Sequence, residues 1–131
     1  MARLYLLIAA LLGGSGVILG AFGAHGLRGK VTEHLLEAYK TGVQYQMIHA
    51  LALFGVALLL QHWNEKTALY VSGGLFTIGV VFFSGSLYWL TLGGPRWLGP
   101  MTPLGGLMMI GGWVALFVAA LSFPNKFSGA G

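Results

Sequence analysis

Long uncharged stretches alternate with short charged segments along this chain. Asp, Glu, Lys and Arg are absent from four stretches, residues 4–24, 43–61, 67–95 and 102–125. A helix needs roughly 20 apolar residues to cross a hydrocarbon core about 30 Å thick, and each stretch reaches that length. The pattern predicts four transmembrane helices, at approximately residues 4–22, 43–62, 67–92 and 103–123.

The charged segment between the first two stretches has a different pattern. In residues 25–41, apolar side chains recur every four positions, and the charged side chains lie largely on the other side. Thr32 is the expected N-cap of a helix, with Glu33 favourable in its first turn. The segment is therefore predicted to form an amphipathic helix lying at the membrane interface, with Gly42 as the bend into the bilayer.

Composition supports a membrane protein with one domain. Of the 131 residues, 56% are hydrophobic and 8% are charged, and the mean hydropathy is +0.80. So few charges cannot cover a soluble globule of this size, and four spans use nearly the whole chain. We expect an all-α polytopic membrane protein with a single domain over residues 1–131. The chain has no cysteine, which excludes disulfides and thiolate metal sites.

The excess of basic residues bears on partners and on orientation. The net charge is +4, and the basic residues lie at predicted helix ends and connections. This placement favours contact with membrane lipids over nucleic acid. Four basic residues flank the first and third connections (Arg28, Lys30, Lys40 and Arg96), against three on the other side (Arg3, Lys66 and Lys126). The balance slightly favours a cytoplasmic location for the first and third connections, although Arg3 argues the other way.

Small residues recur at helical spacing in three of the predicted spans. Such faces let helix backbones approach closely, and we predict that they pack against other helices. The positions are Gly16, Gly20 and Ala24 in the first span, Ser72, Gly79 and Ser86 in the third, and Gly105, Gly112 and Ala119 in the fourth. Tyr88 and Trp89, near the end of the third span, are interpreted as an interfacial aromatic belt.

Polar side chains gather at the start of the second span. Tyr45 and His49 share a helix face because they are four residues apart, and Gln46 lies beside them. A folded-back amphipathic helix would bring His25 near His49. Polar groups at membrane depth either satisfy one another across helices or line a water-filled site for a ligand or proton.

Metal, haem and nucleophilic chemistry have weak support. His25 and His49 are candidate imidazole ligands, but the chain has no Asp, and all three Glu lie in connections. No acid is placed to orient a His–Ser pair with Ser84 or Ser86. We therefore expect no cofactor, no metal and no enzymatic activity.

Four motifs resemble a known family of small membrane proteins. GAFGAHGLRG (20–29), YKTGVQYQMIHALAL (39–53), FSGSLYWL (83–90) and TPLGGL (102–107) are similar to the YgdD/YwdK-like family, the domain of unknown function 423. The resemblance covers nearly the whole chain and implies a four-span protein of the bacterial inner membrane, with a distant mitochondrial relative in animals. It implies no established activity. The family pattern falls on Gly23, Ala24, His25, Gly26, Tyr39, Tyr45, Gln46, His49, Ser84 and Gly85.

Three functional hypotheses follow. The first is a structural or accessory membrane component that packs with copies of itself or with a larger membrane complex. The second is a small transporter, channel or lipid-binding protein with a polar pocket around His25, Tyr39, Tyr45, Gln46 and His49. The third is a metal or haem site ligated by His25 and His49.

Overall fold

The computed structural model describes residues 1–63 and 67–123, and this part of the chain is helical with no strand. The helices are α1 (Ala2–His25), α2 (Glu33–His62), α3 (Thr67–Thr91) and α4 (Met101–Leu121), and a 3-10 helix, η1 (Arg96–Leu98), precedes α4. Each of the four α-helical segments is long and apolar enough to cross a membrane. The prediction of an all-α protein with four spans is confirmed.

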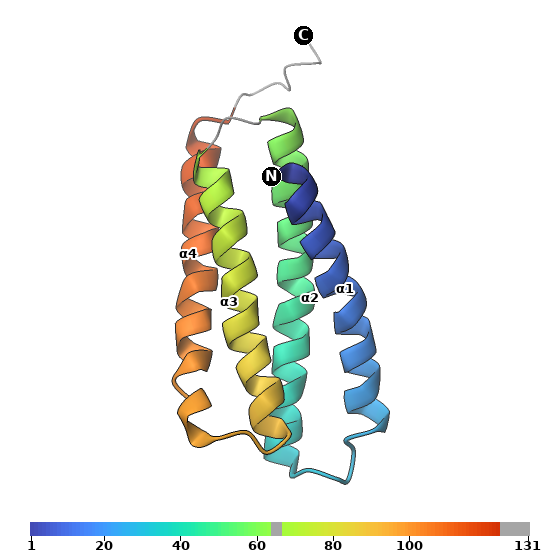
Figure 1. Cartoon of the computed structure of the whole chain (residues 1–131). Helices are drawn as coiled ribbons and strands as arrows, with labels where there is room; N and C mark the ends of the chain where they lie inside the picture. The colour runs from blue at the N-terminus through green and yellow to red at the C-terminus, as the bar shows by residue number, and fades with distance from the viewer. Residues whose placement is uncertain (64–66, 124–131) are drawn as a thin grey trace.

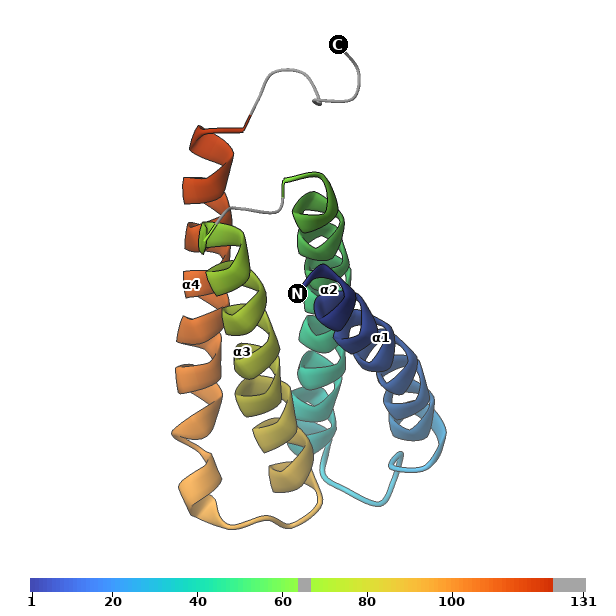
Figure 2. The same cartoon turned by 45° about the horizontal axis from the view of Figure 1, so that its top comes forward.

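Successive helices run antiparallel and pack mainly in chain order. Figure 1 shows that α1 begins and α4 ends at one end of the molecule, while the first and third connections lie at the other. The close pairs are α1 with α2, α2 with α3, and α3 with α4. In both views α1 and α4 lie at opposite edges (Figures 1 and 2), so α2 and α3 form the centre.

The apolar core lies toward the end where α1 begins. Leu53 of α2 and Leu69 and Phe76 of α3 have no exposed surface there. Tyr5 anchors α1 to this core, because its ring covers Gly73 and its hydroxyl donates to the carbonyl of Tyr70 at 2.6 Å. The first turns of α1 therefore reach α3 as well as α2.

The predicted separate interfacial helix over residues 25–41 is wrong. His25 ends α1, residues 26–32 form the connection, and α2 continues without interruption from Glu33 through Gly42. Gly42 is not a bend. A Cβ on it would lie 3.0 Å from the Tyr88 ring and 3.5 Å from the Ser84 carbonyl, so this glycine lets α3 approach closely.

The length of α2 explains why its start looked amphipathic. Its 30 residues span roughly 45 Å at 1.5 Å per residue, about 15 Å more than the hydrocarbon core. The first turns therefore lie at headgroup level, where charged side chains are favourable. Thr32 caps the helix as predicted, accepting a hydrogen bond from the Leu35 amide at 3.2 Å.

The connection after α3 begins with a glycine turn that stops the helix. Gly93 has φ +94°, and the next amide, that of Gly94, donates to the Trp89 carbonyl at 2.8 Å. Together with the bond from the Gly93 amide to the Leu90 carbonyl, this is a Schellman motif. The chain then passes through η1 into α4.

The contact between α3 and α4 is made by backbone as much as by side chains. A Cβ on Gly79 would lie 2.9 Å from the Gly105 carbonyl oxygen, and a Cβ on Gly105 would lie 2.7 Å from that of Gly79. The Ser72 hydroxyl donates to the Gly112 carbonyl at 2.8 Å, and Ser86 bonds Thr102. We call this contact the α3–α4 seam.

Candidate functional site

Gln46 is the centre of the buried polar cluster. Its amide nitrogen donates to the Leu12 carbonyl at 2.8 Å and to the Ser15 hydroxyl at 2.9 Å, both on α1. Its amide oxygen accepts from the Tyr88 hydroxyl of α3 at 2.6 Å. One side chain on α2 thus joins three helices at membrane depth.

Tyr39 makes a second link of the same kind. It is 1% exposed, and its hydroxyl donates to the Leu19 carbonyl of α1 at 2.6 Å. Its ring covers Gly23 on one side and lies 5.1 Å from the Tyr88 ring on the other. The carbonyl of Gly42, one turn along α2, accepts from the Ser84 hydroxyl of α3 at 2.6 Å. These bonds join α1, α2 and α3 in the half of the bundle nearer the first connection.

Both ring nitrogens of His49 have partners. The indole N–H of Trp113, on α4, points at Nε2 at 3.0 Å, and Nδ1 lies 2.8 Å from the Tyr45 carbonyl. An indole nitrogen can only donate, so Nε2 accepts and the proton lies on Nδ1. His49 is therefore the neutral Nδ1–H tautomer, held between α2 and α4.

The structure does not bring together all the residues of the candidate pocket. His25 is exposed in the last turn of α1. The pairs Leu19–Tyr39 and Leu12–Gln46 place His25 beside the first turns of α2, roughly 15 Å or more along the axis from His49. Tyr45 is 39% exposed and turns its ring toward Phe83, with centroids 4.9 Å apart. Gln46, His49 and Tyr39 are buried.

The predicted packing residues have partners within the chain. Gly16 lies against Met47, Gly20 against Val43, and Gly112 against Phe76. Ala119 is 2% exposed, whereas Ala24 is exposed at the end of α1. Most of these small residues are thus engaged by neighbouring helices of the same molecule.

Sequence reasoning missed three partners of the cluster. Ser15 and Trp113 were not singled out, and Tyr88 was interpreted as part of an aromatic belt, whereas its hydroxyl points inward to Gln46. One signal was available for Tyr88: it is four residues after Ser84 and so shares the face that meets α2.

Metal binding by this cluster finds little support in the geometry. Within residues 1–63 and 67–123, no three His, Asp or Glu side chains lie together in a way that would hold a metal ion. His49 would have to break its contact with Trp113 or with the Tyr45 carbonyl to free a nitrogen. The described part of the chain also contains no buried side-chain nitrogen or oxygen without a hydrogen-bond partner.

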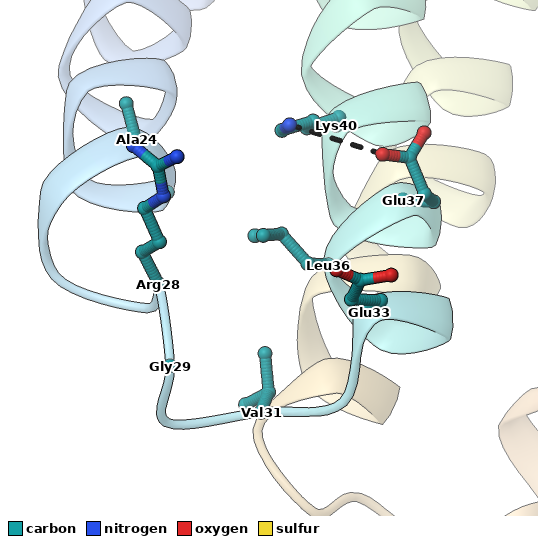
Figure 3. A pocket seen from close by; sticks show the side chains of 9 residues that line it. Ala24, Arg28, Gly29, Val31, Glu33, Leu36, Glu37 and Lys40 are labelled. Carbon is teal, nitrogen blue, oxygen red and sulfur yellow. Dashed lines mark ion pairs between the residues drawn. The ribbon is translucent and has the colours of Figure 1, made fainter.

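A pocket of about 480 Å³ opens between the end of α1 and the start of α2 (Figure 3). We call it the mouth pocket. Its charged lining residues are Arg28 from the connection and Glu33, Glu37 and Lys40 from α2. Figure 3 shows Arg28 running alongside α1 toward Ala24 and Lys40 reaching in from α2 on the other side of the pocket, and Lys40 Nζ lies 3.8 Å from a Glu37 carboxylate oxygen.

Comparison with known proteins shows to which family the chain belongs. A family described as "Protein of unknown function (DUF423)" matches residues 19–106, which include the whole of α2 and α3 and thus Tyr39, Gln46, His49 and Tyr88 of the polar cluster. The UPF0382 membrane protein YwdK of Bacillus subtilis is 42% identical over 121 residues, covering 92% of this chain and 98% of the relative. The chain belongs to this family.

Two other members come from Staphylococcus aureus and Escherichia coli. The UPF0382 membrane protein SAB0533 of Staphylococcus aureus is 40% identical, covering 94% of this chain and 99% of the relative. The UPF0382 inner membrane protein YgdD of Escherichia coli is 37% identical, covering 95% of each chain. No solved structure matches. With its four spans, this DUF423 member is a multi-pass protein of the bacterial inner membrane.

Proposed function

We propose that this protein is a structural or accessory component of the inner membrane, without catalytic activity. One observation carries the proposal: the buried polar side chains bond to the protein's own helices. Gln46, Tyr39 and His49 all have their polar atoms engaged, as described above. A catalyst or a transport pathway needs polar groups that are open to a substrate.

A transport pathway through the cluster would need a polar cavity that reaches His25, Tyr45, Gln46 and His49 from one face. Tyr45 stacks on the His49 ring, but the exposed His25 is separated from the buried Gln46 and His49. This separation favours the structural role over the alternative.

Two unfilled glycine positions support association with another chain. Gly55 on α2 and Gly85 on α3 are half-buried, and a Cβ on either would meet nothing within 4 Å. Glycine lowers helix stability by about 1 kcal/mol relative to alanine, and within the described part of the chain no neighbour lies close enough to these two glycines to account for it. Small residues on a lipid-facing helix surface permit close approach by a helix of another protein.

The test is native mass spectrometry of the protein released gently from its own membrane at its natural level. We expect a mass above 13.9 kDa, from further copies or from other chains. Gly55→Leu or Gly85→Leu should reduce that assembly by blocking close approach. Val114→Leu, a change at a lipid-facing position on α4, is the matched control and should leave it intact.

Two results would contradict the proposal. One is a protein that is found only at 13.9 kDa and is unaffected by either glycine variant. The other is a His49→Ala variant that assembles normally yet loses a physiological activity, because that result would give the cluster a chemical role.

A further inference from the structure

The mouth pocket carries both signs of charge at the depth of the lipid headgroups. Arg28 and Lys40 contribute two positive charges, and Glu33 and Glu37 contribute two negative charges, so the four lining side chains sum to zero. Within residues 1–63 and 67–123, Arg28 has no ion-pair partner, and its guanidinium lies on the opposite side of the pocket from Lys40 (Figure 3). An anionic group between these two cations would relieve their repulsion.

Two further, mainly apolar pockets follow the mouth pocket along the outer face of α1 and α2. A second pocket of about 190 Å³ shares Gly23, Ala24 and Lys40 with the mouth pocket and extends to Gly20 and Val43. Farther along the same two helices lies a pocket of about 270 Å³, lined among others by Gly13, Ala10, Met47 and Leu51. Because Lys40, Gln44, Met47 and Leu51 recur at helical spacing on α2, these pockets follow one face. We call them together the outer groove.

The part of the outer groove between Ala24 and Gly13 matches one leaflet of a membrane, and the groove continues from there to Leu6. Gly13 lies eleven residues before Ala24 on α1, roughly 16 Å along the helix, and half of a hydrocarbon core about 30 Å thick is about 15 Å. In both views α1 diverges from α2 toward the first connection, which is the end that holds the mouth pocket (Figures 1 and 2). The site therefore has a charged end at the interface and an apolar end near the midplane.

We propose that this site binds a zwitterionic phospholipid whose headgroup ends in a primary ammonium, such as phosphatidylethanolamine. Arg28 and Lys40 hold the phosphate, and Glu33 and Glu37 accept from the ammonium. One acyl chain lies in the outer groove over Gly20 and Gly13. The carboxylates of Glu33 and Glu37 would repel a purely anionic headgroup. A quaternary ammonium has no N–H to donate to them. The site does not depend on the proposed accessory role.

The headgroup assignment is tested by native mass spectrometry of the full chain after delipidation. The protein is mixed separately with dioleoyl phosphatidylethanolamine, phosphatidylcholine or phosphatidylglycerol, and bound lipid is counted. We expect phosphatidylethanolamine to be retained best. Arg28→Gln and Lys40→Gln should each weaken its binding about fivefold, the effect of one basic residue near the membrane surface. Lys30→Gln is the matched control, because Lys30 is exposed on the same connection and does not line the pocket.

The acyl-chain assignment has its own matched pair. Gly13→Val fills the outer groove, whereas Gly14→Val changes the next residue, which lines none of the groove's pockets. A Cβ at either position meets nothing within 4 Å, so both variants should fold, which thermal unfolding will verify. Only Gly13→Val should reduce lipid retention.

Three results would overturn the proposal. Equal retention of phosphatidylcholine and phosphatidylethanolamine, insensitive to Arg28→Gln, would mean unspecific annular lipid. Tighter binding of phosphatidylglycerol through Arg28 and Lys40 would mean that the site prefers anionic headgroups. Displacement of the lipid by inorganic phosphate, with no effect of Gly13→Val, would mean that the site binds the phosphate alone and that no acyl chain lies in the outer groove.

Discussion

Gln46 shows how much of this fold depends on one side chain. Its amide bonds a backbone carbonyl and a hydroxyl on α1 and accepts from a tyrosine on α3. A lipid environment offers no water to replace these partners. If the Gln46 amide is removed, the Tyr88 hydroxyl is therefore left without its acceptor. Hydrogen bonds between membrane helices contribute less than this reasoning alone suggests, about 0.6 kcal/mol on average, but Gln46 makes three.

Replacement of Gln46 by leucine is therefore expected to destabilise the protein. Gln46→Leu keeps the volume and removes all three bonds, and we expect a loss of about 1–2 kcal/mol in the free energy of unfolding. The measurement is denaturant-induced unfolding in mixed micelles. Gln44→Leu is the control, since Gln44 is exposed on the same helix and should change stability little. Equal losses in the two variants would show that the network contributes nothing.

At the scale of the element, the α3–α4 seam is set by glycine backbone. The Cβ of an alanine at position 105 would meet the backbone of Phe83 and the carbonyl of Gly79, neither of which can move without moving α3. The neighbouring glycine, Gly106, faces only the Phe83 ring edge, at 3.8 Å, an ordinary contact distance. Two adjacent glycines thus have opposite roles.

Alanine at these two positions should change stability in opposite directions. Gly105→Ala forces the helices apart and should cost about 1–3 kcal/mol in unfolding free energy. Gly106→Ala should be neutral or stabilise by up to about 1 kcal/mol, because alanine favours the helix over glycine. Thermal unfolding in detergent compares them. If Gly105→Ala were as stable as Gly106→Ala, the helices would not be in backbone contact.

The sequence could locate the spans but not the pairing of helix faces. The lack of charge over residues 43–61 marks membrane depth directly, because a charged side chain there is costly. The prediction of a separate interfacial helix was wrong because the amphipathic start and the apolar continuation belong to one helix that runs through Gly42. Gln46 and His49 stood out as polar residues in a span. Ser15 and Trp113 did not, since contacts across 31 and 64 residues depend on which faces meet.

At the scale of the whole molecule, the two ends of the bundle differ by one basic residue. The end with the first and third connections carries Arg28, Lys30, Lys40 and Arg96, against Arg3, Lys66 and Lys126 in the sequence of the other end. Lys66 and Lys126, which belong to the predicted count for that end, lie outside the described residues. Basic residues in short loops tend to remain in the cytoplasm.

This distribution predicts the orientation of the protein, which the absence of cysteine makes simple to measure. In intact cells, a membrane-impermeant maleimide should label Arg3→Cys and leave Lys30→Cys and Gly99→Cys unlabelled until the membrane is opened. The expectation follows from the excess of one basic residue at the end with the first and third connections. Labelling of both Lys30→Cys and Gly99→Cys, but not of Arg3→Cys, in intact cells would reverse the orientation. Labelling of Lys30→Cys without Gly99→Cys would contradict the common location of the two connections.

The bonds that hold α1 have a consequence for how the chain is made. α1 emerges first from the ribosome, yet the groups that fasten it are supplied later: Tyr39 and Gln46 on α2, and the Tyr70 carbonyl on α3. The bonds to Tyr39 and Gln46 can form once α2 has entered the membrane, whereas the bond from Tyr5 needs α3 as well. The docking of α1 is therefore completed only after the third span is in place.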